Sequence, residues 1–169
     1  MVSIQRCELP EVALLRKYLV DGAYADCYAT DTAKPVTHAA YVEAFYTTEV
    51  FKLERLILAL LASKPSTDAQ ANQLASGSLD VFAAWRVEGR AADQILLADY
   101  TGRTRSWLMV APSADARPGT RLYFGSAVVP AKSTRTGNTG LGLTFRALLG
   151  FHKVYSRVLL YAARSRLAR

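Results

Sequence analysis

The stretch FRALLGFHKVYSRVLLYAARSRLAR, residues 145–169, decides the fold. At about 100° per residue its apolar side chains fall on one helical face and its basic side chains on the opposite one. The apolar face comprises Leu141, Phe145, Leu148, Phe151, Tyr155, Leu159, Ala162 and Ala163. The basic stripe comprises Arg146, Lys153, Arg157 and Arg164. The pattern predicts a terminal helix with a buried apolar face backed by a charged one.

This helix has three interpretations. It is a core helix, a core helix whose basic back docks an acidic partner, or a helix that lies on a membrane surface. The core interpretation is favoured because the apolar face is only as wide as packing on a sheet requires. Without the helix, the sheet would also expose a large apolar surface.

The totals predict one globular domain over residues 1–169, since half of the residues are hydrophobic and about a fifth are charged. The longest apolar run, residues 56–62, is far shorter than the roughly 20 residues that a membrane span needs. The N-terminus lacks a signal-peptide pattern. We therefore expect a soluble, cytoplasmic protein without a membrane span.

The net charge of +7 is unevenly distributed, because every acidic residue lies at or before Asp115. Such asymmetry suggests an anionic partner, and a solvated basic surface explains it equally well. No nucleic-acid motif accompanies the charge, so specific nucleic-acid binding is not expected. The two cysteines, Cys7 and Cys27, lack metal-site spacing and are interpreted as free thiols, with a single bridge as the alternative.

The remaining elements follow from local patterns. Residues 23–31 alternate like a first strand, and a helical pattern begins at Thr37. Thr48 is a predicted N-cap, Thr67 and Gln70 fit a capping box, and Gly77 is a predicted helix end. Four strands follow, within residues 79–87, 93–100, 103–110 and 120–129, before a polar loop over 130–140.

Two short turns, TG (101–102) and EGRA (88–91), set the expected faces of this sheet. A two-residue TG turn pairs Leu96 with Trp107 and Ala98 with Arg105. A similar EGRA turn adds Val81, Ala83 and Trp85 to the same face, which becomes an aromatic wall ending in arginines. Ordinary core packing is the alternative interpretation of that wall. The opposite face is also apolar, so we expect helices on one face and a second subunit, in a homodimer, on the other.

The order of strand, helices, antiparallel meander and long terminal helix predicts an α+β fold. It resembles the helix-grip (START-like or SRPBCC-like) architecture, in which an antiparallel sheet wraps a long C-terminal helix and two or three helices follow the first strand. The stretches AYADCYATD, ADYTGRTRSWLMV, GTRLYFGSAVV and the terminal segment also resemble a bacterial family of domains of unknown function. That resemblance singles out Tyr24-Ala25-Asp26 and Phe151-His152-Lys153, and it implies no catalytic pattern.

His152 lies within the apolar face of the terminal helix. It is either a core histidine bonded to a tyrosine or a backbone carbonyl, or a cavity-facing group that orients a ligand or moves a proton. Asp26 is either an acid–base group or a structural carboxylate paired with an arginine such as Arg103 or Arg105. His38 is expected to be solvated. Neither histidine has a second ligand at metal spacing, so no metal or cofactor is expected.

These observations predict a protein that binds an apolar or amphipathic small molecule between the sheet and the terminal helix. No catalytic residue is assigned, although His152 and Asp26 are the candidates for a cyclase- or isomerase-like enzyme on the same scaffold. A non-catalytic domain that docks an acidic partner through the basic stripe is the other alternative. The expected ligand contacts are His152, Tyr155, Phe145, Trp85, Trp107 and Arg105.

Overall fold

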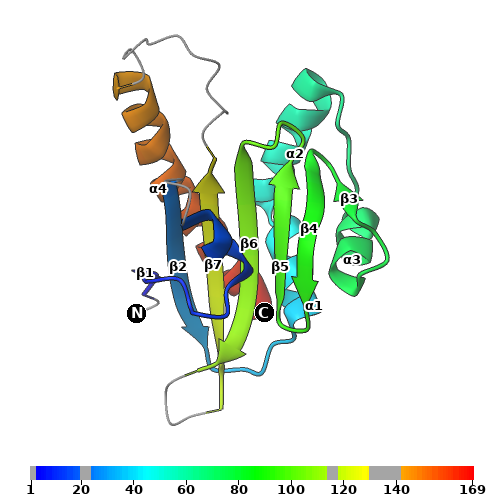
Figure 1. The fold of residues 1–169 in the computed structure, drawn as a ribbon. Helices are drawn as coiled ribbons and strands as arrows, with labels where there is room; N and C mark the ends of the chain where they lie inside the picture. The colour runs from blue at the N-terminus through cyan, green and yellow to red at the C-terminus, as the bar shows by residue number, and fades with distance from the viewer. Residues whose placement is uncertain (1–2, 20–23, 114–117, 130–141) are drawn as a thin grey trace.

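The computed structural model describes residues 3–19, 24–113, 118–129 and 142–169, and only the backbone of 58, 61, 62 and 142–152. Figure 1 shows a broad sheet with the helices behind it. The elements, in chain order, are β1 (Gln5–Arg6), η1 (Leu14–Leu19), β2 (Tyr24–Thr32), α1 (His38–Tyr46), α2 (Glu49–Ala62), α3 (Asp68–Ser76), β3 (Val81–Phe82), β4 (Trp85–Ala91), β5 (Gln94–Asp99), β6 (Thr104–Pro112), β7 (Thr120–Val128) and α4 (Gly142–Leu167). The predicted loop over 130–140 lies outside the described residues.

The seven strands form one antiparallel sheet in the order β1-β2-β7-β6-β5-β4-β3. Strand β2, which precedes the helices, therefore pairs with β7, the last strand of the meander. Helix α4 packs against these two strands and also against α1 and α2. This confirms the α+β prediction, and the arrangement is consistent with a helix-grip-like architecture.

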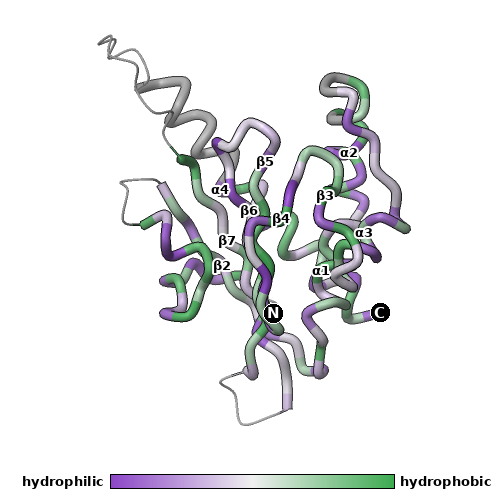
Figure 2. Tube along the Cα trace, turned by 45° about the vertical axis from the view of Figure 1, so that its right-hand side comes forward, coloured by the Kyte–Doolittle hydropathy of each residue, from purple (hydrophilic) through white to green (hydrophobic). Residues whose placement is uncertain are grey.

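The main core lies between the sheet and the helices, because alternate residues of each strand point to that side. Figure 2 shows α1, α2 and α3 together on one side of the sheet. Aromatic rings dominate this core. Phe45 of α1 lies 4.9 Å from Phe124 of β7 and 6.1 Å from Phe51 of α2, measured between ring centroids. These contacts fix α1 and the start of α2 against the sheet.

The N-terminal segment of the same chain covers the opposite face. Leu15 of η1 is fully buried and packs in a second cluster with Trp107, Leu96 and Cys27. The N-terminal segment of the same chain therefore accounts for the apolarity of this face, from which a second subunit was predicted, and the homodimer stays a prediction. The sequence did not reveal this cover because η1 is a short 3-10 helix whose sequence gives no periodic signal.

The predicted hairpin at EGRA is also wrong. The predicted strand over 79–87 breaks at Ala83, whose φ of 51° reverses the chain between β3 and β4. Strand β4 then continues to Ala91, and the turn to β5 is formed by residues 92–93. Trp85 pairs with Asp99 and thus lies on the helix side, opposite to Trp107. The TG hairpin, by contrast, has the predicted register.

The helix caps agree with the sequence prediction. The Thr48 hydroxyl accepts a hydrogen bond from the Phe51 amide at 3.2 Å, and Thr67 forms a capping box with Gln70. Gly77 ends α3 with a φ of 84°, a conformation that glycine adopts without steric cost.

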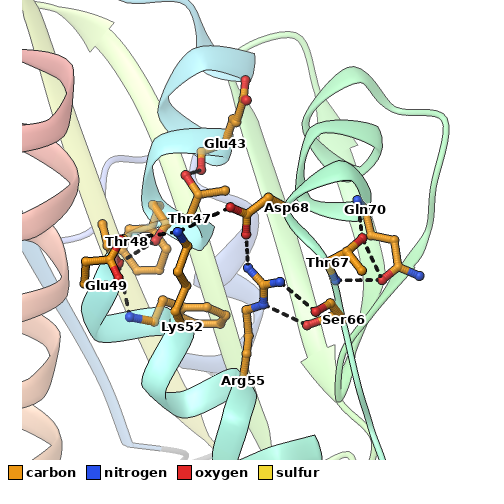
Figure 3. Close-up of polar contacts among 12 residues, drawn as sticks. Glu43, Thr47, Thr48, Glu49, Lys52, Arg55, Ser66, Thr67, Asp68 and Gln70 are labelled. Carbon is orange, nitrogen blue, oxygen red and sulfur yellow. Dashed lines mark hydrogen bonds and ion pairs between the residues drawn. The ribbon is translucent and has the colours of Figure 1, made fainter.

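Arg55 joins α2 to the loop before α3 (Figure 3). Its guanidinium donates to Ser66 Oγ at 2.9 Å, to the Ser66 carbonyl at 2.6 Å and to Asp68 at 2.5 Å. The same group lies 5.7 Å from the ring centroid of Phe82 and is 8% exposed. Lys52, whose side chain is 36% exposed, contacts the same Asp68 carboxylate at 3.3 Å.

Replacing Arg55 with alanine is expected to lower the free energy of unfolding by about 2–3 kcal/mol, because it removes several charge-assisted bonds and leaves a cavity. Lys52→Ala is the matched control, and its expected cost is below about 0.5 kcal/mol because an exposed ion pair contributes little. Urea denaturation of both variants measures the difference. Equal costs for the two variants would contradict the structural role of Arg55.

The C-terminal half of α4 confirms the predicted apolar face, since Leu159 and Ala163 are buried. The described members of the basic stripe, Lys153, Arg157 and Arg164, run along β2. Lys153 lies 5.9 Å from the Tyr24 ring centroid, Arg157 lies over Tyr28, and Arg164 donates to the Asp31 carbonyl. The long aliphatic stems of these side chains let them cover the strand while their charges reach the surface. Three apolar side chains of the same helix, Val154, Val158 and Tyr161, are exposed.

Candidate functional site

A cavity of about 540 Å³ lies between the sheet, α2 and α4. Its wall is largely apolar, with Phe51 from α2, Phe124 from β7 and Leu159 from α4. Leu53 and Ile57 of α2 belong to the same wall and are nevertheless 60% and 48% exposed. The lining residues in the described part of the chain are Phe45, Val50, Phe51, Leu53, Glu54, Ile57, Ala84, Trp85, Asp99, Tyr100, Thr104, Arg105, Ser106, Phe124, Ser126, Tyr155, Ser156 and Leu159.

Glu54 and Tyr155 form a polar pair in this apolar wall. The Tyr155 hydroxyl, from α4, donates to the Glu54 carboxylate, from α2. Burial raises the pKa of Glu54, although the bond from Tyr155 and the nearby Trp85 indole lower it in part. Burial and the Glu54 charge raise the pKa of Tyr155, so the phenol keeps its proton. The pair thus places a carboxylate and a phenol donor at one point of the wall.

Glu54→Gln is expected to leave the protein at least as stable as the wild type near neutral pH, because it removes a partly desolvated charge and keeps an acceptor for Tyr155. The folded wild type holds the Glu54 proton more tightly than the unfolded chain. The contribution of Glu54 to stability is therefore fully present below the pKa of the unfolded chain, about 4.3, and is lost as the pH rises through the raised pKa of the folded protein.

Urea denaturation of both proteins between about pH 4 and pH 8 measures this dependence. The wild type should lose more stability than Glu54→Gln as the pH rises through that window. A variant destabilised by more than about 1 kcal/mol near neutral pH would show that the Tyr155 bond outweighs desolvation, and would contradict the prediction.

Two predicted ligand contacts, Tyr155 and Trp85, line the cavity. Trp85 reaches it because β4 pairs with β5 in the register described above, and not because it shares a face with Trp107. Its indole nitrogen is buried and makes no hydrogen bond of normal geometry to the described residues. The side chains of Phe145 and His152 lie outside the described part of the chain, so their roles stay predictions.

Trp107 does not line the cavity, and Arg105 lines it while its guanidinium makes its contacts elsewhere. Trp107 is fully buried on the other side of the sheet, where its Nε1 donates to Gln94 at 2.9 Å. Arg105 is a lining residue, and its guanidinium lies 4.7 Å from the Tyr18 ring centroid and donates to Glu88 at 2.5 Å. Burial alone would raise the pKa of Glu88, but contacts with Lys17, Tyr18 and Arg105 outweigh it and lower that pKa. Trp107 and Arg105 thus both make contacts that hold the N-terminal segment on the sheet.

Asp26 is 3% exposed, and its hydrogen-bond partners among the described residues are Ser126 and Tyr24 rather than an arginine. Ser126 donates to one carboxylate oxygen at 2.6 Å, and Tyr24 donates to the other at 3.4 Å. The expectation that His38 is solvated is wrong: it is half-buried, its Nε2 has no hydrogen-bond partner within the described ranges, and burial lowers its pKa. His38 packs where α1 begins, beside the backbone of Leu108.

Sequence reasoning missed Glu54 as a site residue. The available signal was an acidic side chain beside the apolar positions 50, 53 and 57 of one helix, where burial is expected on that face. Among the described residues, no three His, Cys, Asp or Glu side chains converge as metal ligands would. Within the same part of the chain, no helix combines the length and apolarity needed to cross a membrane.

Comparison with known proteins leaves the fold and the cavity as the only guides to function. No family model, curated protein or solved structure matches this chain. The class that the fold defines is an α+β protein with an antiparallel sheet, helices after β2 and a C-terminal helix packed on the sheet.

Proposed function

We propose that the protein binds an apolar or amphipathic small molecule in the cavity between the sheet, α2 and α4. The observation that carries the proposal is the cavity itself. Its volume of about 540 Å³ falls in the range of small-molecule sites, which are mostly apolar with a few placed polar groups. The exposed Leu53, Ile57 and Tyr100 at its edge give an entering apolar molecule a continuous surface.

The polar groups in the wall favour a ligand whose head group donates hydrogen bonds. Glu54 and Asp99 are the carboxylates among the described lining residues, and Arg105 turns its charge to the other face of the sheet. Asp99 is occupied by the turn, where it accepts from the amides of Arg103 and Thr104 at 2.8 and 2.9 Å. Glu54 is therefore the acceptor for a hydroxyl or ammonium group, and a ligand carboxylate would meet like charge.

Displacement of the neutral dye Nile red tests this proposal. Three competitors of equal chain length, decanol, decylamine and decanoate, differ only in their head groups. Decanol and decylamine are expected to displace the dye at least about tenfold more effectively than decanoate, which corresponds to about 1.4 kcal/mol. Absence of dye binding would refute the cavity ligand, and a preference for decanoate would refute the role assigned to Glu54.

A second candidate function is acid–base catalysis at the same site. The observation that favours it is the Glu54 carboxylate, whose pKa is raised by burial and which lies beside a phenol donor in a cavity. A catalyst would return an altered small molecule after incubation and would lose that ability in Glu54→Gln. A binding protein would return the molecule unchanged with both forms.

A further inference from the structure

The strand pairing at the N-terminus brings two thiols together. β1 pairs with β2 through Gln5–Ala29 and Arg6–Tyr28, so Cys7 comes to lie opposite Cys27. The Cys7 amide donates to the Cys27 carbonyl at 3.0 Å, and the two Sγ atoms lie 3.3 Å apart. A disulfide needs an S–S distance of about 2.05 Å, so side-chain rotation of roughly an ångström joins the sulfurs without moving the strands.

A small reagent can reach this pair. Both cysteines line a hollow of about 400 Å³ together with Arg6 and Leu19. Cys7 is half-buried, whereas Cys27 is only 2% exposed. The two thiols therefore differ in accessibility, and Cys7 is the one that an external reagent meets first.

The pKa values of the two thiols also mark Cys7 as the more reactive one. In the neutral pair the Cys7 thiol donates to Cys27 Sγ. Once Cys7 has lost its proton, its thiolate accepts the Cys27 S–H, and this bond, with the charge of Arg121, lowers the pKa of Cys7 although burial opposes it. The bond to Cys7 and burial raise the pKa of Cys27. Because the thiolate is the nucleophile in thiol–disulfide exchange, Cys7 is the attacking group and Cys27 the resolving group.

We propose that Cys7 and Cys27 are a site of reversible oxidation, at which a low-molecular-weight disulfide of the glutathione class converts the two thiols into an intramolecular disulfide. The Cys7 thiolate attacks one sulfur of that oxidant, forms a mixed disulfide and releases the first thiol. Cys27 then loses its proton, attacks the Cys7 sulfur and releases the second thiol. The protein loses two electrons and two protons, and the oxidant is reduced to two thiols.

The bond would fasten the N-terminal segment to the sheet. Cys7 precedes the residues that cover Trp107, and Cys27 lies within β2. Closing the chain between these two positions restricts the unfolded state, which stabilises the folded protein in the loop-entropy model. Cys27 lies on the sheet face opposite to the main core and the cavity, so this inference does not depend on the proposed ligand.

The test is equilibration of the reduced full chain with mixtures of oxidised and reduced glutathione. Remaining thiols are then blocked with N-ethylmaleimide, and intact mass and peptide mapping identify the product. The expected product is a monomer that has lost two hydrogens, carries no maleimide and contains the peptide joined through Cys7 and Cys27. Its melting temperature should exceed that of the reduced chain by about 5–10 °C.

Two variants separate the steps. Cys27→Ala is expected to stop at the glutathione adduct on Cys7, and Cys7→Ala should react at least about tenfold more slowly because the remaining thiol is buried. In the wild type, three results would each overturn the proposal: a stable glutathione adduct, a disulfide between two chains, or unreacted thiols. These readings need no variant, so a variant that fails to fold does not affect them. An oxidised form that melts no higher than the reduced form would overturn the stapling role.

Discussion

Replacing Trp107 with alanine is expected to lower the free energy of unfolding by about 3–5 kcal/mol, the cost of removing a large buried aromatic side chain. The indole is fully buried between the sheet and η1, and it donates to Gln94. Gln94 in turn accepts from the Leu14 amide at 2.9 Å and donates to the Val12 carbonyl at 3.0 Å. Loss of the indole therefore loosens the contact between the N-terminal segment and the sheet.

The packing around this indole leaves little room for compensation. A Cβ atom added at Gly125, in the neighbouring strand, would lie 2.9 Å from both Trp107 Cε3 and Leu15 Cδ2. Side chains that close-packed do not collapse fully into the space left by a truncation. The alanine variant should thus carry both the lost burial and a cavity.

Tyr161→Ala provides the control for Trp107→Ala. Tyr161 is also aromatic but is 54% exposed, so its expected cost is below about 0.5 kcal/mol. Urea denaturation measures both variants. A Trp107→Ala protein within about 1 kcal/mol of the wild type would contradict the buried position of this side chain.

Trp107→Phe should bind Nile red as the wild type does, because Trp107 lies outside the cavity.

Replacing Val50 with tryptophan is expected to weaken Nile red binding by at least about tenfold. Val50 is a half-buried cavity-lining residue of α2, so the added indole ring occupies space that a ligand would otherwise fill. The larger side chain is compatible with a helix, and the ring replaces empty volume rather than packed atoms.

Leu60→Trp is the matched control for this substitution. Leu60 belongs to the same helix, is 73% exposed and does not line the cavity. It should bind the dye with wild-type affinity, and fluorescence titration compares the two variants after thermal melting confirms that both are folded. Equal dye affinities for the two variants would place the dye outside this cavity.

The predictable parts of the fold are those fixed by local patterns. The caps at Thr48 and Thr67, and the apolar face around Leu159, follow from hydrogen-bond geometry and helical spacing within a few residues. The β5–β6 register follows from a two-residue turn, because that turn fixes which residues stand opposite each other.

The site was harder to predict because one extra residue in a strand moves all the following side chains to the other face of the sheet. The shift of register between Val87 and Gly89 reverses which residues of the first part of β4, Trp85 included, face the helices. Trp85 and Trp107, expected on one wall, consequently lie on opposite faces. Trp85 belongs to the cavity, and Trp107 belongs to the N-terminal contact.

Contacts between distant segments were beyond local reasoning for a different reason. The pairing of Glu54 with Tyr155 depends on how α2 and α4 approach each other, and neither helix encodes that distance by itself. The basic stripe likewise appears free on a helical wheel, yet Lys153 and Arg157 lie over tyrosines of β2. A wheel gives the direction of a side chain along its own helix, and the neighbouring strand decides whether that direction is solvent.

Whether the cavity holds a small molecule is tested most directly by native mass spectrometry of the protein. Spectra are recorded as isolated and after incubation with decanol, decylamine or decanoate, and each is compared with Val50→Trp. We expect a one-to-one adduct with decanol or decylamine that is lost in Val50→Trp and retained in Leu60→Trp. The bare mass of the chain under every condition, or adducts that are equally abundant in Val50→Trp, would contradict this expectation.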